Sequence, residues 1–130
     1  MSTKYSVAVT HFAESHYIKS FQKDYKKAWN VTWKAIHEEL KRFDSLLDTT
    51  IATVICGDEN IKIAKSEFKI AGTNTSRKTS GNRCIIAVNI KTMSVIVLLV
   101  YSKNHLGNGN ETVKWKSIIK SNYPEYNHLL

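Results

Sequence analysis

Residues 68–105, with the sequence FKIAGTNTSRKTSGNRCIIAVNIKTMSVIVLLVYSKNH, decide the fold. They comprise a basic loop rich in Gly, Ser and Thr, two apolar runs, and a short polar cluster. The two apolar runs, Arg83–Asn89 and Val95–Tyr101, flank a tight turn at 91–94, which predicts an antiparallel hairpin. Because both runs are almost continuously apolar, we expect this hairpin to lie at the centre of a sheet.

The chain before this stretch begins with one strand and continues as two helices. Residues 4–10 alternate polar and apolar side chains, which predicts a half-buried strand. Apolar residues then recur every three or four positions over residues 14–29 and again over 33–47. We place a break at 30–32, so the two segments are predicted to form a helical hairpin packed on a sheet. Trp29 and Trp33 are predicted to be core residues.

Two further strands and a final helix complete the predicted architecture. Residues 51–56 and 61–71 have strand character, and the apolar side chains of the second run change faces midway, which predicts a bulge or bend near Lys65. Trp115, Ile118 and Ile119 indicate an amphipathic helix that Pro124 ends. The expected fold is therefore α+β, in one domain over residues 1–130. It is an antiparallel (mixed) twisted sheet with an N-terminal helical hairpin on one face and a short C-terminal helix.

Composition narrows the classes of function. A formal net charge of +8 raises the odds of a polyanionic partner, either a nucleic acid or an acidic protein. The N-terminus shows no signal-peptide pattern, and the longest apolar run, 95–100, is too short to cross a bilayer. Cys56 and Cys84 lie in apolar strand-like runs and are expected to be buried free thiols. We expect a cytoplasmic protein with no membrane association.

The basic loop is the first candidate site. Arg77 and Lys78 lie among hydroxyl and amide side chains, with Lys69 just upstream and Arg83 just downstream. Arginine binds phosphate in a bidentate fork and lysine acts as a point charge, so this set suits a phosphate-bearing chain. A flexible, solvated loop explains the same composition equally well.

The second candidate is the segment Tyr101–His105, which leaves the most buried predicted strand. In an antiparallel pair that turns at 91–94, Arg83 and Lys103 lie at the same end of the sheet and can converge. Polar groups that leave a rigid strand are held more precisely than those on a free loop. The sequence contains no CxxC or HxxxH pattern, so we expect no metal site, and it contains no Gly-rich phosphate-binding motif.

Two short segments resemble toxins of the RelE/ParE superfamily, the toxic halves of bacterial toxin–antitoxin pairs. These are Ser80-Gly81-Asn82-Arg83, followed by an apolar strand, and Tyr101-Ser102-Lys103-Asn104 at the end of the next apolar strand. The match covers about 40 residues, and the preceding strand and helical hairpin fit the family order. For a RelE-like member, the resemblance implies a ribosome-dependent endoribonuclease that cuts mRNA without a metal or other cofactor. In that reaction the 2′-OH attacks the adjacent phosphorus.

The resemblance also implies roles for individual residues. Arg83 would stabilise the transition state, Lys69 would be a general base, and Lys103 would be a second phosphate clamp. The RNA-binding set would include Arg77, Lys78 and Asn104. His105 is a candidate catalytic acid or base, and the further candidates for proton transfer are Glu67 and Tyr101. The loop before Arg83 is longer than in compact RelE toxins, which leaves the alignment of Lys69 open.

Two other functions are compatible with these observations. One is a ParE-like inhibitor that binds DNA gyrase and cuts nothing, and the other is a basic RNA- or ribosome-binding module without activity. The cations at 69, 77, 78, 83 and 103 favour the nuclease, because the gyrase-inhibiting branch usually lacks such a cluster. Expected partners are mRNA on the ribosome and a cognate acidic antitoxin whose charge complements the basic chain.

Overall fold

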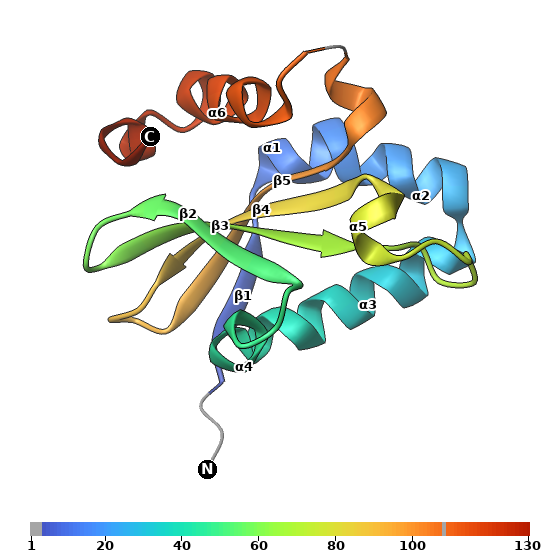
Figure 1. The fold of residues 1–130 in the computed structure, drawn as a ribbon, viewed down its shortest axis with the longest axis horizontal. Coiled ribbons are helices and arrows are strands. Elements are labelled where there is room, and N and C mark those ends of the chain that lie inside the picture. Colours follow the sequence, from blue (N-terminus) through green and yellow to red (C-terminus); the bar gives the residue numbers. More distant parts are fainter. Residues whose placement is uncertain (1–3, 108) are drawn as a thin grey trace.

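The computed structural model describes residues 4–107 and 109–130. Its centre is a five-stranded sheet in the order β1-β5-β4-β3-β2. The strands are β1 (Ser6–Val9), β2 (Ala52–Gly57), β3 (Ile61–Phe68), β4 (Asn82–Asn89) and β5 (Ser94–Ser102). The strand β1 runs parallel to β5, and the other neighbours are antiparallel. The predicted α+β class with a mixed sheet is confirmed, and the 83–101 hairpin lies at its centre (Figure 1).

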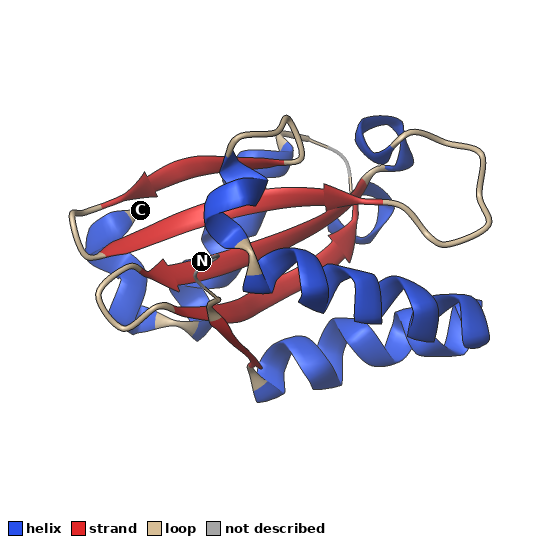
Figure 2. Cartoon of the chain, turned by 90° about the horizontal axis from the view of Figure 1, so that it is seen from below, coloured by secondary structure: helices blue, strands red, loops and turns tan. Residues whose placement is uncertain are grey.

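Helices cover both faces of the sheet. On one face lie α2 (Lys19–Tyr25), α3 (Lys27–Lys41) and α4 (Phe43–Leu47), with α2 and α3 side by side (Figure 2). The short α1 (His11–Ala13) and a π-helical turn, Glu14–Ile18, lead into them. On the other face lie α6 (Glu111–Asn122) and 3₁₀ segments at Lys103–Leu106 and Pro124–Leu129. The one-turn α5 (Arg77–Ser80) precedes β4. None of the helices in the described ranges is long and apolar enough to cross a membrane.

The break in the helical hairpin lies earlier than predicted. It falls at Lys26, which has a positive φ of 51°, whereas 30–32 is continuous helix inside α3. Packing overrides the local preference for a break. The Trp29 ring stacks on Phe21 with centroids 4.8 Å apart. The buried Thr32 hydroxyl donates to the Ala28 carbonyl. The buried state of Trp29 is confirmed.

The bulge or bend predicted near Lys65 is not in β3 itself, but a bulge lies close by in the partner strand β2, opposite Ile63 and Ala64. The strand β3 pairs with β4 without a shift from Ile61 to Phe68, and the irregularities lie in β2 at Val54–Cys56 and in the β4–β5 pair at Ile85–Ile86. The apolar side chains of β3 point to both faces of the sheet because helices cover both faces. The side chains on each face belong to a separate core. Ala64 and Phe68 face the helical hairpin, and Ile63 faces α6.

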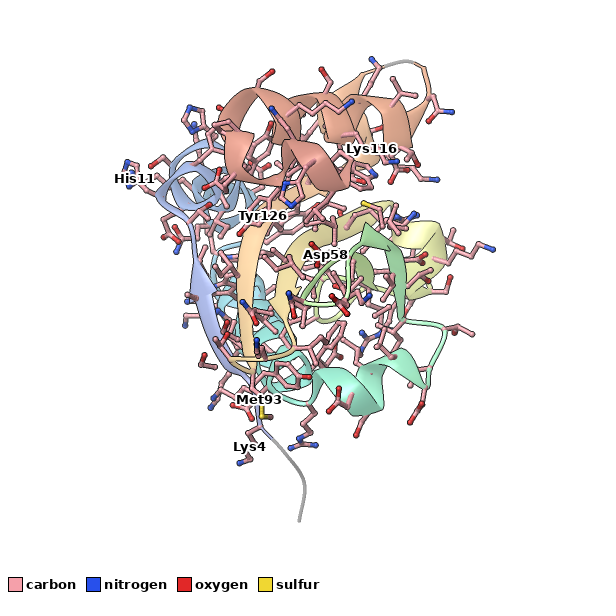
Figure 3. All side chains as sticks on the ribbon, turned by 90° about the vertical axis from the view of Figure 1, so that its left-hand side faces the viewer. Lys4, His11, Asp58, Met93, Lys116 and Tyr126 are labelled. Carbon is pink, nitrogen blue, oxygen red and sulfur yellow. The ribbon has the colours of Figure 1, made fainter. Side chains whose placement is uncertain are left out.

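The α6 side of the sheet carries the second core. Trp115 and Ile119 are fully buried against the sheet, together with Leu99 and Ile85. The helix α6 ends just before Pro124, as predicted, and the chain continues in the 3₁₀ segment Pro124–Leu129. Figure 3 shows this C-terminal layer lying over the sheet on the side opposite α4. The C-terminal layer therefore lies over the end of the central hairpin, where Tyr101 of β5 contacts Glu111 of α6.

Candidate functional site

Three polar side chains form a row across the centre of the sheet. In the register of the strands, Glu67 of β3 pairs with Arg83 of β4, and Arg83 pairs with Tyr101 of β5. Directly paired residues point to the same face of a sheet, and Tyr101 belongs to the core beneath α6. The row therefore faces α6, near the end of the hairpin where β4 begins and β5 finishes.

Arg83 is the buried cation of this row, with 3% of its surface exposed. Its Nη1 donates to the Asn82 carbonyl at 3.1 Å and its Nη2 to the Lys78 carbonyl at 3.1 Å. Two carboxylates flank it, with Glu67 Oε2 4.0 Å from Nη1 and Glu111 Oε2 3.6 Å from Nε. A buried charge is tolerated only when it is paired and hydrogen-bonded, and Arg83 is paired with two carboxylates and hydrogen-bonded through both Nη atoms.

Glu111, the first residue of α6, joins the row from above. Its Oε2 accepts a hydrogen bond from the Tyr101 hydroxyl at 2.6 Å and also lies beside Arg83. Burial raises the pKa of Tyr101 above its ordinary range, and the hydrogen bond and charge of Glu111 raise it further. Tyr101 therefore keeps its proton near neutral pH and is a hydrogen-bond donor in this site.

Lys103 and Asn104 follow the end of β5 and lie beside this row. The Lys103 N–H donates to the Gly81 carbonyl at 2.9 Å, so the two ends of the hairpin meet as the strand geometry predicted. Gly81 has a φ of 77°, and a Cβ there would lie 3.4 Å from the Lys103 side chain. Lys103, Asn104 and Glu111 line one cleft together with Gly107 and Gly109.

Arg77 and Lys78 lie on the other side of the row. They line a groove with Glu67, together with Thr50, Ile51, Thr53 and Ser76. The Arg77 guanidinium is bound to the Glu39 carboxylate, with Nη1 3.0 Å from Oε2 and Nη2 2.5 Å from Oε1. This bidentate pair fixes the basic loop to α3, so the loop is anchored. Arg77 Nη1 also donates to the Glu67 carbonyl at 3.4 Å, and the Lys78 side chain is exposed.

The structure does not group Lys69 and His105 with Arg83. The strand β3 ends at Phe68, so Lys69 leaves the face of Glu67 and lines a groove with Val31, Ala35 and other residues of α3. His105 Nδ1 accepts the Ser102 N–H at 3.2 Å, and its ring packs edge-on against Phe21. Within residues 4–107 and 109–130, no hydrogen bond or ion pair joins either side chain to Arg83.

A comparison with solved structures places this arrangement in a known fold. The chain superposes on RelE in the archaeal RelE–RelB complex from Pyrococcus horikoshii OT3, with a TM-score of 0.56 and 13% sequence identity. The match covers 80% of this chain and 98% of that chain. The protein has a RelE-like fold. No protein-family model matches the sequence, and no curated protein matches it.

In this RelE-like fold, sequence reasoning missed Glu111. A glutamate directly after the capping residue Asn110 is typical of the first turn of a helix, where its negative charge interacts favourably with the helix dipole. This common role gives no indication of its contact with Arg83. Only the position of α6 over the sheet brings the two together. Among the described residues, no group of three or more His, Cys, Asp or Glu side chains could hold a metal ion.

Proposed function

We propose that this protein is the toxin of a toxin–antitoxin pair and a metal-independent endoribonuclease that cuts mRNA on the ribosome, in the cytoplasm. The observation that carries the proposal is the Glu67–Arg83 pair, a carboxylate 4.0 Å from a guanidinium on neighbouring strands. The RelE-like fold, the net charge of +8 and the resemblance around Ser80–Arg83 support it. A carboxylate and a cation on rigid strands are the groups that RNA transesterification needs.

The reaction needs a base, a stabiliser of charge and an acid. Glu67 accepts the proton of the 2′-OH, whose oxygen forms a bond to the adjacent phosphorus. Arg83 and Lys103 compensate the charge that develops on the phosphorane. The bond from phosphorus to the 5′-oxygen then breaks, and that oxygen takes a proton, for which Lys103, in the cleft beside Glu111, is the candidate donor. The products are a 2′,3′-cyclic phosphate and a free 5′-hydroxyl.

Glu67 is a better candidate base than Lys69. Glu67 lies opposite Arg83 in the register and lines the groove with Lys78, whereas Lys69 lies in a different groove beside α3. We assign phosphate contacts outside the reacting centre to Lys78 and Asn104, whose side chains are exposed on either side of the row. Arg77, bound to Glu39, holds the loop that carries Lys78.

A toxin of this kind needs a neutralising partner. We infer an acidic antitoxin protein, because the chain carries a charge of +8 and the structural neighbour is a RelE in complex with RelB. Complementary charge would speed the encounter of the two proteins and favour correct pairing.

The test is expression of the protein in a bacterial host, followed by primer extension on several mRNAs. The wild-type protein should produce cuts within translated codons, and Glu67→Gln should lower the cutting rate by about 10²- to 10⁴-fold, the usual range for a general base. Lys91→Ala, in the exposed turn between β4 and β5, is the matched control and should cut normally.

Two outcomes would overturn the proposal. Intact mRNA together with arrested replication and inhibited gyrase supercoiling would indicate the gyrase-inhibitor function instead. Intact mRNA with the protein bound to ribosomes would indicate a non-catalytic binding module. Unchanged cutting by a folded Glu67→Gln variant would remove the proposed base, and Arg83→Lys, which keeps the charge, tests the guanidinium in the same assay.

A further inference from the structure

Arg83 retains unused hydrogen-bonding capacity. Two of its N–H groups donate to the main chain, but its Nε is buried and has no hydrogen-bond partner among the described residues. A buried donor without a partner is rare and costly in folded proteins. In arginine, Nε and one Nη form the edge that binds an oxyanion in a bidentate fork. The Nε edge of Arg83 is therefore set up to take an anion.

The group that stands at this edge is the carboxylate of Glu111. Its Oε2 lies 3.6 Å from Nε, which is too far for a good hydrogen bond. The same oxygen is committed to the Tyr101 hydroxyl at 2.6 Å. The Glu111 side chain is 22% exposed and also lines the cleft with Lys103 and Asn104. It thus lies between the cleft and the unsatisfied N–H of a residue that is only 3% exposed.

We propose that Glu111 occupies the position of an RNA phosphate at Arg83 and competes with it, so that RNA must displace this carboxylate to reach the buried cation. The inference rests on the proposed function, since it names the group that controls access to the same site. Carboxylate and phosphate bind a guanidinium with the same geometry, so one can replace the other. The incoming phosphate oxygen makes the Nε hydrogen bond that Glu111 does not make.

The surroundings allow the exchange. Rotation of the Glu111 side chain toward the cleft exposes Nε and brings the carboxylate near Lys103, which lines the same cleft. Gly107 and Gly109, which precede α6, both have positive φ. Glycine adopts this conformation without steric cost, so the chain can turn there into the first turn of α6. Glu67 stays in place on β3 and remains available as the proposed base.

The experiment measures RNA binding, so its result does not depend on whether the protein cleaves RNA. Binding of a short RNA that is 2′-O-methylated at every position, which cannot be cut by 2′-OH attack, is followed by fluorescence anisotropy. Glu111→Gln keeps the shape and removes the charge, and it should bind on the order of tenfold tighter than wild type, as expected for loss of one partly screened like charge. Glu59→Gln, an exposed glutamate in the β2–β3 turn, is the matched control and should change nothing.

A second variant and a second readout keep the inference falsifiable. Glu111→Ala also removes the charge but loses the bond to Tyr101, so equal tightening in both variants assigns the effect to the charge. The ¹⁵N resonance of Arg83 Nε should shift when the oligonucleotide binds, at lower concentration in Glu111→Gln than in wild type. Weaker or unchanged binding by folded variants, or an Nε resonance that does not respond, would overturn the inference. Tighter binding in a protein that cuts no RNA would refute only the proposed nuclease.

Discussion

Replacement of Tyr101 by phenylalanine separates a structural role of this tyrosine from a catalytic one. The phenol is fully buried, and its hydroxyl donates a hydrogen bond of 2.6 Å to Glu111. Phenylalanine keeps the ring that packs beneath α6 and removes only the donor. The bond joins β5 to the first turn of α6, so its loss should weaken the attachment of the C-terminal layer.

The magnitude follows from the character of the bond. A hydrogen bond to a charged acceptor contributes about 1.5–3 kcal/mol, and an acceptor left buried costs most of that amount. The Glu111 side chain is 22% exposed, so water can recover part of the loss. We therefore expect the free energy of unfolding to fall by about 1.5 kcal/mol, which for a chain of this length lowers the melting temperature by roughly 6 °C.

The assay is thermal and denaturant unfolding near neutral pH, with Tyr25→Phe as the control. Tyr25 is 42% exposed, so its variant should melt within about 1 °C of wild type. RNA cutting by Tyr101→Phe should stay within a fewfold of wild type, because the raised pKa of Tyr101 makes it a poor proton donor. Equal melting of the two variants would refute the energetic reasoning, and loss of about 100-fold in cutting would make Tyr101 the catalytic acid.

Three further predictions concern the anchor of the basic loop, the thiols and alkaline pH. Glu39→Gln should cost about 0.5–1 kcal/mol and speed amide exchange in the loop that Arg77 anchors, and normal exchange there would argue against an anchor. Burial raises the pKa of the Cys84 thiol to about 12, so only Cys56 should react with a maleimide in the folded protein. The pKa of Tyr101 is raised in the folded state, so its stabilising effect is fully present below the ordinary tyrosine pKa of about 10 and is lost as pH rises further. Wild type and Tyr101→Phe should therefore converge in free energy of unfolding at strongly alkaline pH.

The periodic parts of the chain were predictable from sequence. The hairpin of β4 and β5 has almost continuous apolar runs, so its central place and the meeting of its ends followed from strand geometry alone. The break at Lys26 was not predictable, because a lysine with positive φ carries no local signal and the stacking of Trp29 on Phe21 is a tertiary contact. The regular pairing of β3 with β4 was missed for a related reason, since the sequence does not reveal that helices cover both faces of the sheet.

The composition of the site was only partly predictable. Arg83 and Lys103 lie at the same end of the sheet because β4 and β5 are antiparallel neighbours, and the Lys103 N–H donates to the Gly81 carbonyl there. The salt bridge of Arg77 to Glu39 joins residues 38 positions apart, and the contact of Arg83 with Glu111 depends on where α6 packs. Carboxylates far away in sequence decide which of several cations is free, and a pattern of basic residues contains no information about them.

The burial of Arg83 and its proposed use have the same physical origin. The strand β4 is covered on both faces, so a cation near its start must be compensated by anions in place, and Glu67 and Glu111 supply them. If a phosphate replaces Glu111, the number of anions beside the guanidinium stays the same and the buried charge is never left bare. Removal of Arg83 would instead leave the carboxylates of Glu67 and Glu111 without the cation that compensates their charge. Under the proposed function, the cation stabilises the fold before RNA binds, and exchange of one anion for another would make it available for catalysis without unfolding the site.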